Sequence, residues 1–118
     1  MLRETLVVQR TKLGSEHFDT LTTTAFLADA LQTLGRADEA KELRRSVAEA
    51  RVRLLGPDHP QSLVARTNLA YVLGDCREFT EAETILLDLL ERRQRLLGAD
   101  HAEVALTYSM LGSNALLA

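Results

Sequence analysis

The sequence has little of several features that mark particular classes of protein. It contains a single cysteine, Cys76, so no disulfide can form within the chain, as is usual in a reducing compartment. Tryptophan is absent, and aromatic residues make up only 4% of the chain. No apolar run approaches the roughly 18 residues that a membrane helix needs, and no secretory signal peptide is visible. These absences predict a soluble, cytoplasmic protein.

An excess of charge of either sign is also missing. The 14 basic residues face 17 acidic ones, which gives a net charge of −3. This near balance offers no electrostatic footprint for nucleic acid and no basic face for a membrane surface. The two prolines, Pro57 and Pro60, lie in one short segment, and the apolar residues are mainly leucine and alanine, which favour helices. We therefore expect an all-α protein that binds neither nucleic acid nor a membrane.

One motif, Leu-Gly-x-acid-His, occurs three times at equal spacing. It begins at Leu13, Leu55 and Leu97, so its glycines lie 42 residues apart. When residues 14–55 are placed over 56–97, thirteen positions are identical and no gap is needed. A fixed period of this length is typical of repeat proteins. The sequence predicts one domain with a half repeat at 1–13, full repeats at 14–55 and 56–97, and a half repeat at 98–118.

Apolar residues recur at helical spacing in six segments, and no strand is indicated. Because the connections are short, neighbouring helices should be antiparallel. Asp38 is the expected N-cap of the third helix, and Thr80, with Glu83 three residues later, is the expected capping box of the fifth. The expected helices span about 2–13, 18–34, 38–54, 60–76, 80–96 and 103–117.

Each expected helix has one stripe of residues that should face its neighbours. The Arg44-Arg45 and Arg92-Arg93 pairs lie beside acids and are expected on solvated faces. In the first helices of the full repeats, the inner residues are Leu21, Thr24, Leu27, Ala28 and Leu31, and Leu63, Leu69, Ala70 and Leu73. In the second helices they are Ala40, Leu43, Val47, Ala48 and Leu54, and Ala82, Leu86, Leu89, Leu90 and Leu96. In the last helix they are Leu106, Tyr108, Leu111 and Ala115.

The spacing inside each repeat resembles that of a tetratricopeptide repeat. Leu69-Ala70, Leu73, Phe79 and Ala82 carry this resemblance. The 42-residue period and its Leu-Gly-Ala-Asp-His link resemble the longer variety found in kinesin light chains. The resemblance implies a right-handed α-α superhelix of antiparallel helix pairs whose first helices line a concave side. It also implies a non-catalytic scaffold that binds a peptide or helix of a partner protein, often within a larger signalling protein.

In that architecture, residues beside the inner stripe of each first helix face the groove. Asn68 can bond both a backbone N–H and a C=O of a peptide, and Tyr71 offers a flat anchor with a polar tip. No lysine or arginine is among these residues, which argues against a clamp for an acidic tail. The plain alternative is that they form solvated helix faces. The candidate contact residues are Thr22, Phe26, Asp29, Val64, Thr67, Asn68, Tyr71, Asp75, Ser109 and Met110, with Ala25, Gln32, Leu106 and Ser113 beside them.

Residues that could suggest chemistry have simpler explanations. His17, His59 and His101 stand at equivalent places in successive repeats, too far apart to hold one metal ion, so we expect each imidazole to bond near a helix start. Cys76 has no neighbouring base in the sequence. The sequence therefore predicts no catalytic site, no metal and no cofactor.

Self-association is the alternative function. A helical pair cannot bury its apolar stripe alone, so the ends of a solenoid need a polar outer face or a neighbour. If the terminal helices stack on another copy, the chain is an oligomerisation module rather than a peptide receptor.

Overall fold

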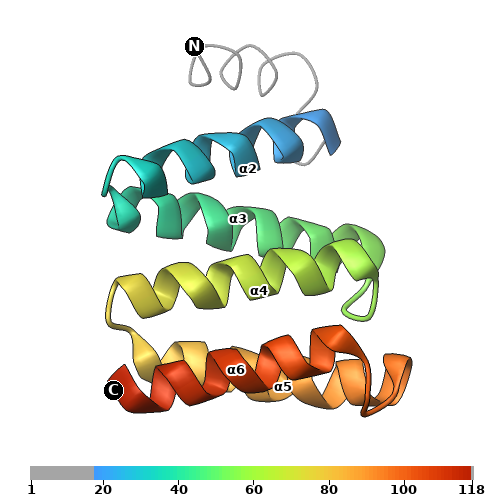
Figure 1. The fold of residues 1–118 in the computed structure, drawn as a ribbon. Coiled ribbons are helices and arrows are strands. Elements are labelled where there is room, and N and C mark those ends of the chain that lie inside the picture. The colour runs from blue at the N-terminus through green and yellow to red at the C-terminus, as the bar shows by residue number, and fades with distance from the viewer. Residues whose placement is uncertain (1–17, 118) are drawn as a thin grey trace.

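The structure of this chain, a computed structural model, describes residues 18–117. Within these residues the chain forms α-helices and no strand, as the sequence predicts (Figure 1). The helix expected over 2–13 and the first copy of the motif, including His17, lie outside the described residues. The described helices are α2 (Phe18–Thr33), α3 (Ala37–Leu55), α4 (Pro60–Asp75), α5 (Phe79–Leu97) and α6 (Ala102–Leu117).

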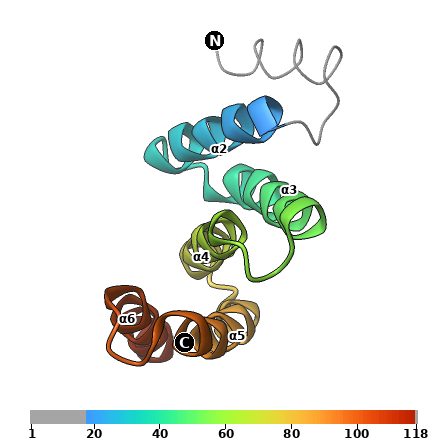
Figure 2. The ribbon, with the colours of Figure 1, turned by 90° about the vertical axis from the view of Figure 1, so that its right-hand side faces the viewer.

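The helices form a row in which each one packs mainly against the helix before and the helix after it. Equivalent helices are offset by the 42 residues of the sequence period, because α2 and α4 begin at 18 and 60, and α3 and α5 at 37 and 79. Figure 2 shows α2, α4 and α6 on one side of the row, with α4 set back between the other two. We call the surface made by α2, α4 and α6 the first-helix face. The all-α solenoid predicted from the sequence is confirmed.

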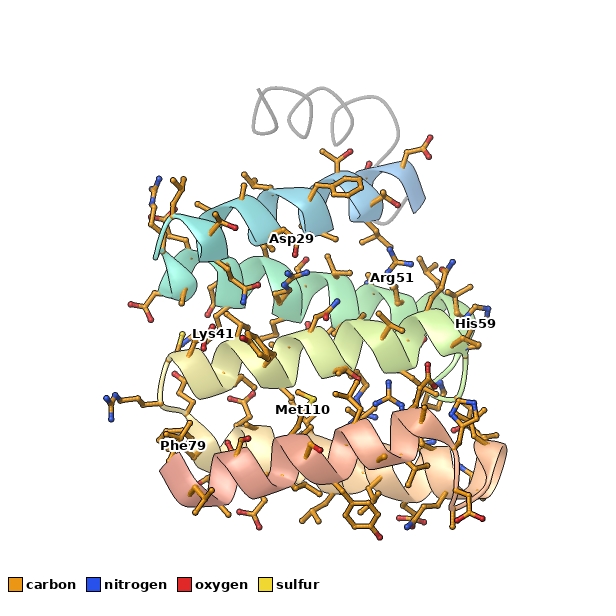
Figure 3. All side chains as sticks on the ribbon, in the orientation of Figure 1. Asp29, Lys41, Arg51, His59, Phe79 and Met110 are labelled. Atoms are coloured by element: carbon orange, nitrogen blue, oxygen red, sulfur yellow. The ribbon has the colours of Figure 1, made fainter. Side chains whose placement is uncertain are left out.

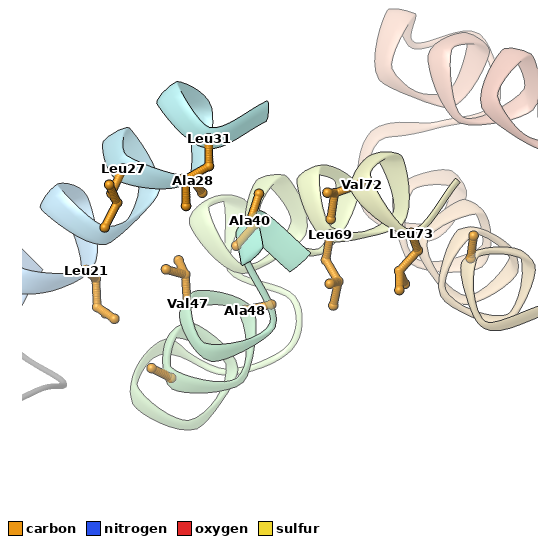
Figure 4. Packing of buried hydrophobic residues seen from close by; sticks show 13 residues of the cluster. Leu21, Leu27, Ala28, Leu31, Ala40, Val47, Ala48, Leu69, Val72 and Leu73 are labelled. Carbon is orange, nitrogen blue, oxygen red and sulfur yellow. The ribbon is translucent and has the colours of Figure 1, made fainter. Parts of the chain in front are cut away.

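The core is made of the leucine and alanine stripes. The stripes expected on the first helices of both full repeats are buried, from Leu21 to Leu31 on α2 and from Leu63 to Leu73 on α4. Alanines such as Ala28 allow neighbouring helices to approach closely, and each fully buried leucine contributes about 2–3 kcal/mol through the hydrophobic effect (Figure 4). A second buried cluster joins α4 to α5 through Leu63, Ala70, Leu86 and Leu89.

The stripes expected on the second helices are partly wrong. Leu54 and Leu96 are exposed, and Leu43 and Leu90 are only half-buried. Two arginines from the pairs expected on solvated faces, Arg44 and Arg93, are buried instead. A long arginine side chain can lie along apolar surface while its guanidinium group reaches polar partners on a neighbouring helix. The residue type alone therefore does not predict whether such a side chain is buried or exposed.

The stripe expected on α6 is also wrong. Leu106, Tyr108 and Ala115 are exposed and Leu111 is half-buried. The buried residues are Val104, Thr107 and Asn114. The reason is that α6 packs mainly against α5, so only the side of α6 that faces α5 is covered within the described residues. No helix in residues 18–117 is both long enough and apolar enough to cross a membrane.

The turns inside the two repeats share one backbone design. After α2, the N–H of Gly35 bonds the carbonyl of Gln32, and the N–H of Arg36 bonds the carbonyl of Leu31. This pair of bonds is the Schellman motif, which places one residue in the left-handed region. Gly35 has a φ of 78° there, and at the end of α4 the equivalent Arg77 adopts a φ of 61°.

This turn design overturns the two expected N-caps. Helix α3 begins at Ala37, directly after Arg36, and α5 begins at Phe79, directly after Glu78. Arg36 and Glu78 give their N–H groups to the preceding helix, and neither makes a side-chain cap bond. Asp38 and Thr80 therefore lie inside the first helical turn, and the Thr80 carbonyl accepts a bond from Thr84 Oγ1 at 3.1 Å.

The repeated motif is the connector between one repeat and the next. Gly56 and Gly98 end α3 and α5 with φ of 91° and 89°, a backbone conformation open almost only to glycine. The histidines then start the next helices. Nδ1 of His59 accepts a hydrogen bond from the N–H of Gln61 at 3.1 Å, and His101 does the same for Glu103 at 3.1 Å. The expectation that these imidazoles bond near helix starts is confirmed for both.

Replacing His59 by alanine is expected to lower the free energy of unfolding by about 1 kcal/mol, because the change removes an N-cap acceptor. His59→Asn should retain most of the stability, since an asparagine oxygen can accept the same bond. Urea denaturation followed by circular dichroism measures both variants. Equal losses for alanine and asparagine would show that the Nδ1 bond does not stabilise α4.

Ion pairs join the connector between α3 and α4 to α5, and α4 itself to α5. Asp58 of the motif accepts bonds from Arg92 at 2.7 Å and Arg95 at 3.2 Å, and these two guanidinium groups lower the pKa of its carboxyl. Arg66 of α4, which is half-buried, bonds Asp88 of α5 at 2.5 Å. That pairing explains how α4 accepts a charged residue on its packed side.

Candidate functional site

The first-helix face carries two hollows, one on each side of α4. The first, which we call the basic cavity, has a volume of about 310 Å³. It lies between α2 and the N-terminal half of α4, with α3 as its floor. Its lining is largely apolar apart from two arginines and two amides. The lining residues are Ala25, Arg44, Val47, Arg51, Pro60, Gln61, Val64, Ala65 and Asn68.

Arg44 is held in the basic cavity by α2. Its Nε and Nη2 donate to Gln32 Oε1 at 3.0 and 2.8 Å, and Nη2 also forms an ion pair with Asp29. The side chain is only 7% exposed, whereas Asp29 is exposed. A buried guanidinium that is fixed by three bonds keeps a defined position, so it can present its remaining donors without loss of rotamer freedom.

Arg51 supplies the second positive charge of the basic cavity. Its Nη1 donates to Gln61 Oε1 at 2.8 Å, and within the described residues it forms no ion pair with a carboxylate. Burial lowers the pKa of the Arg51 guanidinium, although arginine stays protonated at neutral pH. Figure 3 shows Arg51 on the same side of the molecule as His59, which caps the start of α4. Arg44 is paired with Asp29, whereas Arg51 forms no ion pair within residues 18–117, so the cavity keeps a positive charge that no carboxylate of those residues neutralises.

The second hollow, which we call the acceptor cavity, has a volume of about 290 Å³. It lies between the C-terminal half of α4 and α6, with Leu86 of α5 in its floor. Figure 3 shows Met110 between α4 and α6, and Phe79 toward the opposite end from His59. The two cavities therefore lie at different positions along α4. The lining residues are Ala70, Tyr71, Gly74, Asp75, Phe79, Leu86, Ser109, Met110, Ser113, Asn114 and Leu117.

A buried arginine closes the space between α4 and α6 at the place that corresponds to the basic cavity. Arg93 is the repeat equivalent of Arg51, and its Nη2 and Nη1 donate to Thr67 Oγ1 at 2.8 Å and Thr107 Oγ1 at 3.0 Å. The equivalent positions around Arg51 hold Ala25 and Ala65, which offer no hydroxyl. The same arginine thus bridges two helices in one repeat and is left beside a cavity in the other.

The sequence matches models of a known protein family. Two family models, both described as tetratricopeptide repeat, match the sequence, one over residues 19–77 and the other over 62–103. The first match alone covers half of the chain. The chain belongs to the tetratricopeptide repeat family. Tetratricopeptide repeats generally mediate protein–protein interaction, and such a scaffold is typically non-catalytic. Comparison with curated proteins returns no match.

Solved structures relate this tetratricopeptide repeat chain to kinesin light chains. It resembles a putative kinesin light chain of Podosopora anserina with nearly identical TPR-like repeats, at a TM-score of 0.89 and 25% identity. It also resembles BtubC (BKLC) from P. vanneervenii, at a TM-score of 0.79 and 27% identity. The matches cover 98% of this chain but only 55% and 45% of those chains. This chain thus spans about half the length of those structures, and its repeats are of the kinesin-light-chain-like kind.

The contact residues expected from the sequence fall into three groups in this tetratricopeptide repeat. Some line the two cavities: Ala25, Val64 and Asn68 the basic cavity, and Tyr71, Asp75, Ser109, Met110 and Ser113 the acceptor cavity. Some bond buried arginines: Asp29 and Gln32 bond Arg44, and Thr67 bonds Arg93. The rest lie elsewhere on the face: Phe26 and Leu106 are exposed outside both cavities, and Thr22 lines a shallower hollow of about 270 Å³ beside Arg51.

The sequence reasoning missed the residues that the second helices contribute to the cavities. None of the first-helix positions named from the sequence is basic, but Arg44 and Arg51 line the basic cavity from α3. One signal was present, since Arg51 and Arg93 are among the thirteen identities of the repeat and an exposed arginine has little reason to recur. For Arg44 there was no such signal, because its repeat equivalent is Leu86. The lack of lysine and arginine on the first helices therefore does not exclude an acidic ligand.

The thiol of Cys76 is not activated as a nucleophile in the described part of the chain. Burial raises the pKa of the Cys76 thiol, and a hydrogen bond with Asp38 raises it further, which disfavours the thiolate that a nucleophile needs. Among residues 18–117, no cluster of three or more histidine, cysteine or acidic side chains could hold a metal ion. The arrangement offers shape, charge and hydrogen bonds, which serve binding.

Proposed function

We propose that this chain binds an extended peptide segment of another protein along the first-helix face. The observation that carries the proposal is that both cavities open on this face and flank the same helix, α4. Preformed hollows on a rigid surface suit the capture of side chains from a peptide or helix. The kinesin-light-chain-like repeats are in line with a module of a larger scaffold or signalling protein.

The basic cavity suggests which residue of the partner it would accept. Arg44 and Arg51 supply guanidinium donors, and Asn68 on the wall supplies an amide. Arginine pairs with carboxylates through two parallel bonds, and such charge-assisted bonds are stronger than neutral ones. Because Val47, Val64 and Ala65 make the rest of the lining apolar, a carboxylate with an apolar neighbour would fit. We therefore expect an acidic residue of the peptide in this cavity.

Removing the side chains of Asn68 and Tyr71 should strongly weaken peptide binding without unfolding the chain. Random peptides of about twelve residues, long enough to span both cavities, are displayed on phage and selected against the immobilised chain. Asn68→Ala combined with Tyr71→Ala is expected to weaken the selected peptides at least about tenfold, measured by fluorescence anisotropy. The free energy of unfolding should change by less than about 1 kcal/mol, because neither residue is buried.

The matched control is Gln94→Ala combined with Tyr108→Ala. This pair also removes one amide and one tyrosine, joined by a bond of 2.9 Å, but it lies outside both cavities. The control should keep full peptide affinity. If no peptide is enriched, or if both double variants bind equally well, the first-helix face is not the binding surface.

A further inference from the structure

The acceptor cavity combines an apolar base with polar groups that include several hydrogen-bond acceptors and no cationic side chain. Leu86, Met110 and Leu117 supply apolar surface from α5 and α6. The side chains of Tyr71 and Phe79 place two aromatic rings in the same lining. The remaining polar members are one carboxylate, three hydroxyls and one amide, and no lysine, arginine or histidine lines the cavity. A ligand group that fits here needs an aliphatic stem and a head that donates hydrogen bonds.

Asn114 adds a buried acceptor to the acceptor cavity. Its side chain is only 8% exposed, and its Nδ2 donates to the backbone carbonyl of Phe79 at 3.0 Å. One hydrogen of the amide nitrogen is used in this way, and Oδ1 remains as an acceptor that can bond a ligand. Asp75, at the last residue of α4, is exposed and supplies a carboxylate at the same cavity. Acceptors thus stand at the buried side and at the rim.

We propose that the acceptor cavity binds an arginine side chain of the partner peptide. The inference rests on the proposed function and assigns a second residue of the same ligand. The guanidinium pairs with the Asp75 carboxylate and lies against the rings of Tyr71 and Phe79, where cation–π attraction and stacking favour a planar cation. Its stem covers Met110 and Leu117, as long basic side chains do on apolar surface. Arginine fits better than lysine because its five donors match several acceptors and its plane matches the rings.

The two cavities then have opposite electrostatic character. The basic cavity holds the charge of Arg51, which no carboxylate of the described chain balances, whereas the acceptor cavity holds the carboxylate of Asp75. A peptide with one acidic residue and one arginine would bind in a single direction, because the reverse direction would bring like charges together. The stretch of α4 from Val64 to Asp75 is about 16 Å long at about 1.5 Å per residue. In an extended peptide this length corresponds to a separation of about five residues.

The test compares peptide selection on the unmodified chain with selection on the Asp75→Lys variant. Asp75 is exposed and ends α4, where a cation suits the negative end of the helix dipole, so the variant should fold. Peptides selected on the unmodified chain should be enriched in arginine at one position, about five residues from an acidic residue. Selection on Asp75→Lys should lose that arginine. Glu83→Lys makes the same charge change at an exposed position of α5 outside both cavities, and it should leave the arginine enrichment unchanged.

A second measurement addresses the arginine directly. The best selected peptide is made again with citrulline in place of its arginine, which keeps the shape and removes the charge. We expect its affinity for the unmodified chain to fall at least about tenfold, and its affinity for Asp75→Lys to change little, since one partner of the ion pair is already gone.

Each possible failure has a distinct meaning. Arginine enrichment that survives Asp75→Lys, or citrulline that binds as well as arginine, would overturn the assignment of this cavity while leaving peptide binding intact. Lysine enrichment in place of arginine would overturn the choice of a planar cation. The absence of any enriched peptide on the unmodified chain would overturn the proposed function and this inference together.

Discussion

Replacing Leu73 by alanine is expected to lower the free energy of unfolding by about 3–5 kcal/mol, the range for a leucine truncated in a packed core. Leu73 is 0% exposed and belongs to the buried cluster that includes residues of α2, α3, α4 and α5. Since each helix packs mainly on its chain neighbours, the middle helix α4 depends mainly on its packing against α3 and α5. Stabilities of single domains are about 5–15 kcal/mol, so this loss is a large fraction of the total.

Leu34→Ala is the matched control. It removes the same atoms from a side chain that is 69% exposed, and it should change stability by less than about 0.5 kcal/mol. Urea denaturation followed by far-UV circular dichroism gives both values. If the two variants lose similar amounts, the cluster around Leu73 does not hold the helices together.

Arg93 is expected to respond in opposite ways to two substitutions. Arg93→Ala should lower the free energy of unfolding by about 2–4 kcal/mol, because it leaves a cavity between α4, α5 and α6. Arg93→Met should keep the stability or raise it by about 1–2 kcal/mol. The difference in stability between the two variants separates the effect of side-chain packing from the effect of the charge.

The reason lies in the surroundings of the guanidinium. Arg93 is 2% exposed, its Nε has no partner, and burial lowers the pKa of its guanidinium. Its two bonds go to hydroxyls that remain bonded without it, since Thr67 and Thr107 each also donate to a backbone carbonyl at 2.8 Å. Methionine would fill much of the same space without the desolvation of a charge. Chemical denaturation of both variants is the measurement, and equal destabilisation by methionine and alanine would contradict it.

Sequence periodicity was a reliable guide for the first helices of the two full repeats, α2 and α4. The stripes from Leu21 to Leu31 and from Leu63 to Leu73 could be predicted because each contains leucines and alanines that recur at the helical spacing. Helix order and the 42-residue offset followed from the repeated motif. Turn chemistry was harder, because Arg36 and Glu78 act in two helices at once and displace the N-caps expected at Asp38 and Thr80.

The candidate site could be predicted only in part. Its walls come from first helices, and the positions beside their inner stripes identified Val64, Asn68, Tyr71 and Asp75 as cavity-lining residues. Its floors come from second helices, whose register against the first helices depends on packing. The direction of a long side chain such as Arg44 also depends on the partner that it finds on a neighbouring helix. The spacing of apolar residues determines neither the register of the second helices nor the direction of a long side chain.

The connector built on Leu-Gly-x-acid-His has a consequence for how such a protein can grow. The connector between α3 and α4 makes its bonds within its own repeat or to the helix end before it, since Gly56 ends one helix, His59 caps the next, and Asp58 bonds Arg92 and Arg95 of the same repeat. A tandem duplication of one 42-residue unit therefore brings both of its own junctions with it. A duplication of this kind lengthens the first-helix face by one more pair of helices. The residues on the new surface can then change while the connectors keep their bonds. Genes with a variable number of copies of this unit would then encode first-helix faces of different length that share the same connector.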